Sequence, residues 1–496
     1  MQDRTAETPP ALSVTEALVP VASLVILVGL SFYLFGEGGA DGPNQIALVV
    51  ASLVAVFIGW RRGYTLDALR EAAVASVGTG VGAMFILFAV GSLVGTWAMS
   101  GTLMAMVYYG LQILSPHYLY MTSAIICGLV SLCIGSSWTV VSTIGIGLMG
   151  IAINMDLDPA ITAAAIISGA YLGDKSSPLS DSTNLAAVAT GANLYEHIVE
   201  TLWTSMPAFL LALGFFWFLG EPGDFDASEK IASIHSSFNI TPILFLPLVV
   251  VLALAILKFP PFTTIFTGAI AGGILAVWVS PERVIAFASD ADLSETLALL
   301  KGVWQALASG YQSSTGDAGI DQLLTRGGMA SMLGTIWLII TALAFGGVVE
   351  KIGVLECLIA PLVRKIKSIG ALVASLVGAT ITTNVVTADQ YIAIVLPGRM
   401  FKNAFSDRGY KPVVQSRAIG DTATVTSALI PWNSCGAFMA ATLGVATVSY
   451  APFAFFNILS PLMTILFAFM GWRMLRAPQG QDAPLAPPAP GTGANN

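Results

Sequence analysis

The sequence predicts an all-α polytopic membrane protein, built from inverted-topology repeats with two re-entrant hairpins and two interrupted helices. Three observations carry this prediction: the apolar composition, the placement of basic residues and a weak internal repeat. Of the 496 residues, 55% are hydrophobic and 10% are charged, and the mean hydropathy is +0.80. Soluble domains carry about 25% charged residues. Most of this surface is therefore expected to face membrane lipids.

The same composition excludes several classes of function. The net charge of −8 and the lack of a basic tract exclude nucleic-acid binding. The four cysteines form no CxxC or Cys/His cluster, so neither a zinc site nor a disulfide framework is expected. No Walker A sequence for ATP is present, and no His/Glu or Ser/His pattern lies at membrane depth. We therefore expect a protein that is not an enzyme and needs no cofactor.

The apolar runs define the segments of the chain in order. They are a cytoplasmic N-terminal segment without the features of a cleaved signal peptide (1–16), scaffold helices (17–77), a first inverted repeat (78–219), linker helices with an external segment (220–329), a second inverted repeat (330–472) and a disordered cytoplasmic tail (473–496).

Basic residues set the orientation, because loops on the cytoplasmic side carry an excess of Lys and Arg. With the N-terminus in the cytoplasm, the Lys/Arg clusters within 61–70, 364–367, 399–417 and 473–476 all lie inside. Both termini are then cytoplasmic, and the chain is expected to reside in the cell (inner) membrane.

Each repeat is expected to contain a hairpin followed by an interrupted helix. The hairpins are placed at 117–155 and 368–398, and the interrupted helices at 159–192 and 413–445. The hairpin arms are short for a full span, which needs about 20 residues, and their middles are polar. Non-helical backbone is tolerated at membrane depth where it lines a cavity. Re-entrant hairpins thus fit better than full spans.

The two halves resemble each other weakly. Asp174 aligns with Asp421, each after a glycine, and Ser137 aligns with Asn384. Chance similarity between Gly-rich apolar stretches is the alternative, but the repeated order of hairpin, Gly-Asp and interruption weighs against it. The charge-derived topology places the halves in opposite orientations. Inverted repeats with broken helices near the midplane are typical of secondary transporters.

Five charged residues fall within apolar sequence: Asp174, Lys175, Asp181, Asp389 and Asp421. Charges at the centre of a bilayer are costly and usually mark ion or proton pathways. For Lys175 three roles stay open: it neutralises a neighbouring aspartate, acts as an internal cation, or reaches toward an interface.

The stretch 173–186 holds the strongest candidate site. Pro178 removes a backbone donor, and several Ser, Thr and Asn side chains compete for the freed groups, so the helix is expected to open. An opened helix exposes carbonyl and hydroxyl oxygens to an alkali cation, and Asp174 or Asp181 supplies the charge. A helix cap formed by Ser180 and Asp181 is the structural alternative.

The stretch 420–436 has the same layout but lacks a second acid and a lysine, so the first half is the better candidate for the main carboxylate. A plain ion pair of Asp421 with Arg417 is the alternative there. The hairpin tips, predicted at 135–139 and 380–384, are expected to complete a polar chamber, with Trp138 as a chamber wall or a packing residue. The candidate ion- or substrate-binding residues are Ser137, Thr139, Asp174, Ser180, Asp181, Thr183, Asn184, Thr383, Asn384, Asp389, Asp421, Thr424, Asn433 and Ser434.

The stretch 173–186 resembles the hallmark G-D-K-x-S-P-L-S-D-[ST]-T-N of the NhaC-type sodium/proton antiporter family, which belongs with the ion transporter superfamily. The matching positions are Gly173, Asp174, Lys175, Ser177, Pro178, Leu179, Ser180, Asp181, Ser182, Thr183 and Asn184. The similarity covers roughly 17–472. The resemblance implies inverted repeats with re-entrant hairpins, an elevator-like motion of a transport domain against a scaffold, and a homodimer.

We therefore expect exchange of sodium for protons at one site, with Asp174 and Asp181 as the sodium ligands. Burial disfavours the charged form of a carboxylate, so protonation and sodium binding compete. The family also includes sodium-coupled exchangers of small organic acids. Exchange of an acid of the malate or lactate kind, coupled to sodium or protons, is the alternative.

Overall fold

The computed structural model describes residues 12–220, 228–290, 292–315, 320–321, 324–366 and 368–477. In this part of the chain the regular structure is helical, apart from two isolated bridges, Tyr311–Arg326 and Tyr410–Arg476. Nine of its helices are long and apolar enough to cross a membrane, or ten if one bent pair counts as a span. The prediction of an all-α polytopic membrane protein is therefore confirmed.

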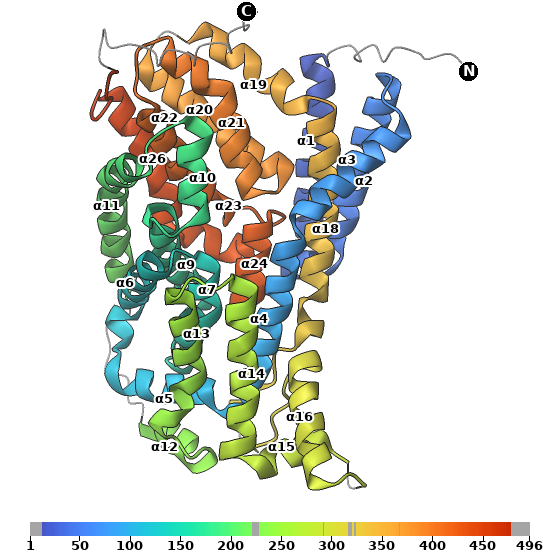
Figure 1. The fold of residues 1–496 in the computed structure, drawn as a ribbon, viewed down its shortest axis with the longest axis vertical. Helices are drawn as coiled ribbons and strands as arrows, with labels where there is room; N and C mark the ends of the chain where they lie inside the picture. Colours follow the sequence, from blue (N-terminus) through green and yellow to red (C-terminus); the bar gives the residue numbers. More distant parts are fainter. Residues whose placement is uncertain are drawn as a thin grey trace, which may run out of the picture.

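The two predicted terminal segments are only partly described, since 1–11 and 478–496 lie outside the described residues. The first turn of α1 and the residues that follow α26 lie at the same end of the molecule, the upper end in Figure 1. At that end the Lys411 amide donates to the Leu475 carbonyl over 2.9 Å, which joins the last described residues to a loop of the second half.

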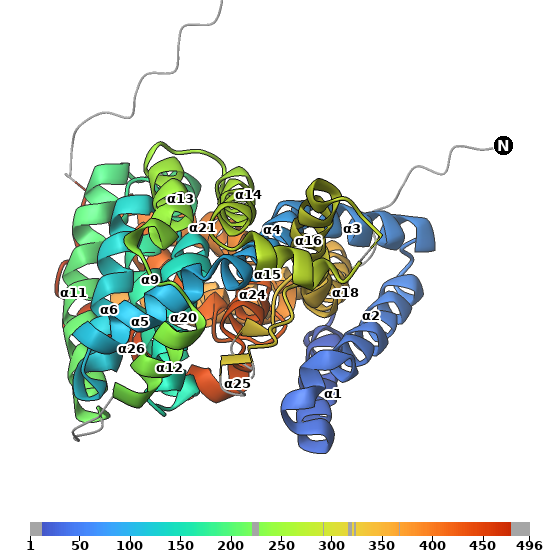
Figure 2. The same cartoon turned by 90° about the horizontal axis from the view of Figure 1, so that it is seen from below.

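A group of helices stands at one side of the molecule (Figures 1 and 2). They are α1 (Val14–Phe35), α2 (Pro43–Arg61), α3 (Leu66–Thr79) and α18 (Leu333–Lys351). Ser13 and Glu16 form a capping box that begins α1, and the Thr65 hydroxyl caps α3. The short 3-10 helix Gly36–Asp41 connects α1 to α2.

A second group packs around α4 (Val81–Ser100). Its members are α5 (Thr102–Ile113), α12 (Ser228–Ser237), the 3-10 helix Pro242–Phe245, α13 (Leu246–Ile256), α14 (Pro261–Val279), α15 (Pro281–Ala288) and α16 (Glu295–Ser309). The buried Trp97 indole on α4 donates to the Gly268 carbonyl on α14 over 3.2 Å. Small residues here allow close approach, since a side chain at Gly272 would meet Trp97.

The first half continues with a pair of arms and a broken helix. The elements are α6 (Pro116–Ile134), α7 (Ser137–Val140), a π segment (Val141–Gly145), α8 (Ile146–Asn154), α9 (Pro159–Ser176), α10 (Asp181–Thr190) and α11 (Leu194–Phe218). The chain turns at Gly135, whose φ is +78°. The Asp158 amide donates to the Tyr120 hydroxyl over 3.0 Å, so the far ends of the two arms meet.

The second half has a similar series. Its elements are a 3-10 helix (Met329–Met332), α19 (Val354–Lys365), α20 (Ile369–Thr387), α21 (Gln390–Ser406), α22 (Pro412–Ile419), a π segment (Gly420–Thr424), α23 (Val425–Ser427), α24 (Ser434–Leu443), α25 (Thr447–Tyr450), a 3-10 helix (Ala451–Phe453) and α26 (Phe455–Phe469). The Arg408 guanidinium donates to the Ile366 carbonyl over 2.8 Å, so the far ends of these arms also meet.

The turn of the second pair of arms differs from the sequence expectation. The chain turns at Ala388, whose φ is +57°, and not within 380–384, which is helical. The threonine hydroxyls explain the difference, because they bond back to the carbonyls of their own helix. Thr383 donates to the Ala379 carbonyl and Thr387 to the Thr383 carbonyl, both over 2.8 Å. The polar stretch that suggested a tip is therefore a regular helix.

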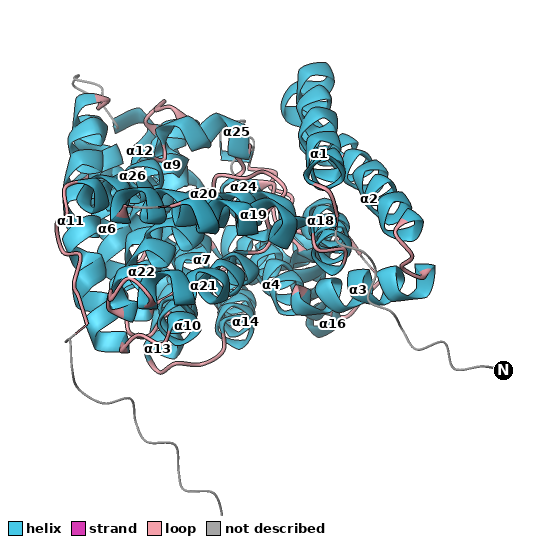
Figure 3. Cartoon of the chain, turned by 90° about the horizontal axis from the view of Figure 1, so that it is seen from above, coloured by secondary structure: helices cyan, strands magenta, loops and turns pink. Residues whose placement is uncertain are grey.

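Both expected interruptions lie where the sequence places them. The first is the non-helical stretch 177–180 between α9 and α10, and the second is 428–433 between α23 and α24. A π segment precedes the second break. Figure 3, viewed from above, shows α20 and α21 in the middle of the larger helix group and α10 near its lower edge.

Candidate functional site

Three hydroxyls surround the carboxylate of Asp174 at the end of α9. Ser137 Oγ donates to Oδ2 over 2.5 Å, and Ser180 Oγ and Ser182 Oγ donate to Oδ1 over 2.6 and 3.1 Å. Ser137 is the first residue of α7, directly after the turn, while Ser180 ends the break and Ser182 lies in the first turn of α10. Asp174 is only 8% exposed. The site therefore joins the first turn to the first break through hydroxyl oxygens.

Close backbone approach keeps this turn against the break. A side-chain carbon at Gly135 would lie 2.7 Å from the Leu179 carbonyl carbon and 2.8 Å from the Ser180 amide. Thr183 Oγ1 also donates to the backbone carbonyl of Asp174 over 2.9 Å. Asn184 donates to the Ser180 carbonyl over 2.7 Å. Thr183 and Asn184 thus hold the shape of the break.

Asp181 is the first residue of α10, and its side chain is exposed. The predicted capping alternative is observed for Ser180, which is the N-cap residue and accepts from the Thr183 amide at 3.5 Å. The Asp181 carboxylate is therefore left on the surface of the break.

The second turn and the second break are joined through side-chain amides. Asn384 Nδ2 donates to the Ala423 carbonyl over 2.8 Å, and Asn433 Nδ2 donates to the Asn384 carbonyl over 3.1 Å. The Ser434 amide donates to the Ala388 carbonyl over 3.0 Å. Asn384 and Asn433 are completely buried, so they act as connectors within the protein.

Asp389 is placed by its role at the start of α21. Its Oδ1 accepts from the Ile392 amide over 2.8 Å, which makes it the N-cap residue of that helix. It is 6% exposed. Gln390 follows it and accepts from Ser427 Oγ and Cys435 Sγ, over 2.9 and 3.1 Å.

A cavity of about 610 Å³ brings these segments together. Five of the predicted site residues line it: Thr139, Asp174, Asp181, Asp389 and Ser434. Ser137 and Ser180 lie directly behind this wall, bonded to Asp174. Three carboxylates from both halves therefore face one space.

Several cavity residues are not among the predicted site residues. They are Ser136, Ser182, Gln390, Tyr391 and Cys435 near the breaks and turns, Thr79 at the end of α3, and Lys258 and Thr264 from outside the repeats. Ser182 and Gln390 directly follow predicted site residues, so adjacency is a usable signal for them. Lys258 ends an apolar run and carries no such signal. Trp138 fits both roles left open for it, since it lines the cavity and stacks on Phe438 at 3.9 Å between ring centroids.

The remaining predicted residues are not among those that line the cavity. Thr383 is bonded within α20, and Thr424 is buried. Asp421 pairs with Lys175 instead: Lys175 Nζ donates to Asp421 Oδ1 over 2.6 Å, and both side chains are completely buried. The structure thus shows Lys175 neutralising an aspartate from the other half. The alternative pair of Asp421 with Arg417 is not observed, because Arg417 pairs with Glu200 at 3.4 Å.

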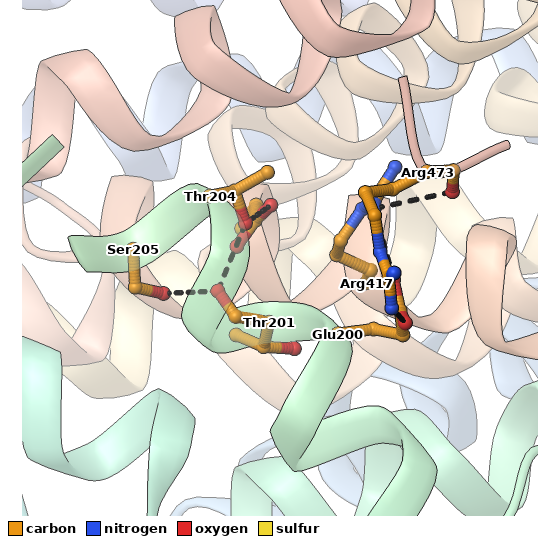
Figure 4. A network of polar contacts seen from close by, with 7 residues as sticks. Glu200, Thr201, Thr204, Ser205, Arg417 and Arg473 are labelled. Atoms are coloured by element: carbon orange, nitrogen blue, oxygen red, sulfur yellow. Dashed lines mark hydrogen bonds and ion pairs between the residues drawn. The ribbon is translucent and has the colours of Figure 1, made fainter. Parts of the chain in front are cut away.

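A buried polar network lies beside this pair and is not predicted from the sequence. Glu200 on α11 is bound by Arg417 of α22 and by Arg473 of the last described segment, as Figure 4 shows. One turn further along α11, Thr204 Oγ1 donates to Asp421 Oδ2 over 2.6 Å. The network therefore connects the upper end of the molecule with the Lys175–Asp421 pair.

The cavity wall carries oxygen atoms of the type that hard cations bind. Among the residues that the structure describes, no group of three His, Cys, Asp or Glu side chains is placed to hold a metal ion. Carboxylate and hydroxyl oxygens at Asp174 are the hard ligands of alkali and alkaline-earth cations. With three aspartates and one lysine on its wall, the cavity is also electronegative.

Comparison with known proteins gives a consistent result. The model of the "Na+/H+ antiporter family" matches residues 169–472. The Na(+)/H(+) antiporter NhaC of Alkalihalophilus pseudofirmus is 37% identical over 431 residues, which cover 86% of this chain and 90% of the relative. NhaC of Bacillus subtilis is 34% identical over 454 residues, covering 90% and 95%. The Malate-2H(+)/Na(+)-lactate antiporter of Bacillus subtilis is 31% identical over 460 residues, covering 92% and 94%.

Proposed function

Because this chain belongs to the Na+/H+ antiporter family, together with relatives named NhaC, we propose that it exchanges sodium for protons through the cavity between its two breaks. It is a multi-pass membrane transporter rather than an enzyme. The observation that carries the proposal is the shared cavity lined by Asp174, Asp181 and Asp389.

In this proposal Asp174 is the central ligand. When its carboxylate is charged, the hydroxyls of Ser137, Ser180 and Ser182 donate to it. When a sodium ion binds, it neutralises the Asp174 carboxylate, and the hydroxyls rotate so that their oxygen lone pairs coordinate the ion. A proton removes the charge instead, so one occupant excludes the other. Exchange follows if the protein changes conformation only when Asp174 is occupied.

Two features support a re-entrant hairpin in each half. The ends of each pair of arms meet, at Tyr120 with Asp158 and at Ile366 with Arg408, while each turn reaches a break. The three longest arms are long enough to span a membrane, so length does not decide the matter. The proposal of re-entrant hairpins therefore depends on the two turns, which contact the non-helical breaks inside the protein.

Cysteine accessibility tests the topology. We propose that both termini are cytoplasmic in the cell membrane and that the protein is a homodimer. A cysteine at Ser13 and one at Asp407 are then labelled by a membrane-impermeant maleimide only in inverted vesicles. Labelling of either one from the outside contradicts the orientation, and a monomer by crosslinking in membranes contradicts the dimer.

Vesicle exchange tests the function. Asp174→Asn and Asp181→Asn are each expected to abolish sodium-driven proton movement in proteoliposomes, because neither neutral amide can carry the exchanged charge. Asp67→Asn is the matched control, since Asp67 lies on α3 with its side chain 79% exposed and pairs only with Arg70 at the surface. Wild-type exchange by both Asp174→Asn and Asp181→Asn contradicts the assignment.

A second candidate function is exchange of a small organic acid coupled to sodium or protons. Lys258 on the cavity wall favours it, because an ammonium beside the carboxylates offers a partner for an anionic substrate. The volume of about 610 Å³ also exceeds the need of a single ion. Adding malate or lactate to the sodium-flux assay separates the two candidates: stimulation by the acid supports the second one.

A further inference from the structure

The buried carboxylate of Asp421 already has a cation beside it, and this cation is the side-chain ammonium of Lys175. Lys175 Nζ lies 2.6 Å from Asp421 Oδ1 and 2.5 Å from Ser460 Oγ. Lys175, Asp421 and Ser460 are all completely buried. The ammonium is thus sealed between α9, the π segment after α22, and α26.

The atoms around this ammonium are those that an alkali cation would need. A carboxylate oxygen of Asp421 and the hydroxyl oxygen of Ser460 contact Nζ, and Ser460 Oγ donates its own proton to the Asp421 backbone carbonyl over 3.0 Å, so its lone pairs are free to face a cation. Thr204 Oγ1 holds the other carboxylate oxygen, Oδ2, over 2.6 Å. The ring of Phe456 lies 5.1 Å from Nζ, a position that favours a cation of either kind. Hard oxygen ligands of this type bind alkali and alkaline-earth cations.

The charges next to Asp421 do not offer it another partner. Arg417 lies one helical turn before Asp421, but its guanidinium pairs with Glu200, which Arg473 also binds (Figure 4). His197 bonds through Nδ1 to Ser416 Oγ over 2.7 Å. The neutrality of the buried Asp421 carboxylate therefore depends on Lys175.

Asp174 and Lys175 are neighbours on α9, but their side chains lie in different environments. Asp174 lines the cavity and accepts hydrogen bonds from three serine hydroxyls, while Lys175 is not among the cavity residues. In the sequence, Asp174 aligns with Asp421, so the two carboxylates hold corresponding positions of the two halves. The Asp174 carboxylate is open to the cavity, whereas the Asp421 carboxylate is paired with Lys175, the residue that follows Asp174.

We propose that Asp421 is the core of a second alkali-cation site, which the tethered ammonium of Lys175 keeps permanently occupied, so that each chain binds sodium at Asp174 alone. This inference rests on the proposed function, because it assumes that Asp174 binds sodium. It also assigns Lys175 the role of an internal cation, in addition to that of a neutralising partner.

Sodium counting tests the inference. Equilibrium binding of radioactive sodium to the purified full-length protein at alkaline pH is expected to give one ion per wild-type chain. Lys175→Gln is expected to raise the count to two, because the vacated oxygen set accepts a second ion. Lys175→Gln combined with Asp421→Asn is expected to return it to one. Lys351→Gln is the matched control, since it removes an exposed lysine at the end of α18.

Each outcome is decisive. Two ions per wild-type chain, or one ion per folded Lys175→Gln chain, overturns the inference. If Lys175→Gln is poorly folded, its melting temperature is measured against sodium concentration. A steeper rise than in the wild type supports a second site, and instability at every sodium concentration, with a stable Lys175→Gln/Asp421→Asn double variant, overturns it. Failure of the proposed function gives a different result: no sodium bound by the wild type.

Discussion

Asp174 and Asp421 align in the sequence and each follows a glycine, but their surroundings differ. Asp174 faces the cavity, and its partners are three serine hydroxyls. Asp421 is sealed, and its partners are Lys175 and Thr204. A carboxylate held by hydroxyls can exchange one cation for another, whereas one paired with a buried lysine cannot without breaking that pair. In the proposed mechanism the first half binds the transported ion at Asp174, while the second half holds a buried ion pair between Asp421 and Lys175.

The largest expected difference concerns stability. Asp421→Asn leaves the ammonium of Lys175 buried without a counter-charge, which costs about 3–5 kcal/mol. Asp174→Asn removes a carboxylate that has no cation partner, so its cost is expected to be smaller, about 1–3 kcal/mol for the buried hydrogen bonds that it disturbs. Melting temperatures of the two purified variants in detergent measure the difference.

Combining the changes gives the control for this prediction. Lys175→Gln with Asp421→Asn replaces the ion pair by neutral groups, and we expect it to recover most of the stability that Asp421→Asn loses. Equal melting temperatures for Asp421→Asn and Asp174→Asn would show that the pair contributes nothing to the fold, and the comparison of the two halves would then fail.

Most of the first of these two candidate sites can be seen in the sequence, because its parts other than Ser137 are close together along the chain. Asp174, Ser180 and Ser182 belong to one short segment, and Pro178 marks the break between them. A motif of this kind can be read directly, since the residues that interact are separated by eight positions at most. The expected spans follow from composition for the same reason, because hydropathy is a local property.

The second site is beyond such reasoning, because its partners come from distant segments. Lys175 and Asp421 are 246 residues apart, and Lys175 and Ser460 are 285 apart. Lys258 reaches the cavity from outside both repeats. Thr383 shows a different difficulty: its hydroxyl bonds to its own helix rather than to a turn. The hydrogen-bond partner of a polar side chain depends on tertiary packing, which the sequence pattern does not specify.

Two serines, one at each aspartate site, allow a second comparison, with an expected effect of intermediate size. Ser137 lies 2.5 Å from an oxygen of Asp174, and Ser460 lies 2.5 Å from Lys175 Nζ. Ser137→Ala removes a proposed ligand of the transported ion and is expected to weaken the apparent sodium affinity about ten-fold, which corresponds to about 1.4 kcal/mol. Ser460→Ala is expected to change that affinity less than about two-fold and to lower the melting temperature instead.

The measurement is the sodium concentration that gives half-maximal proton movement in proteoliposomes. The melting temperature of each variant is recorded beside it, so that a loss of folded protein is not mistaken for a loss of affinity. A ten-fold loss of sodium affinity in Ser460→Ala, with an unchanged melting temperature, would show that the second site takes part in transport.

The smallest expected effect concerns Lys258, the cation on the cavity wall. It is exposed, so its repulsion of a sodium ion is screened by water and is worth about 1 kcal/mol or less. Lys258→Gln is therefore expected to strengthen the apparent sodium affinity by about two- to five-fold and to leave the maximal rate unchanged, with Lys402→Gln, an exposed lysine on α21, as the control. If Lys258 instead holds an anionic substrate, the same variant loses acid-stimulated flux while sodium affinity stays the same. The Lys258→Gln variant therefore distinguishes a site that binds an ion alone from a site that binds an ion together with a carboxylate substrate.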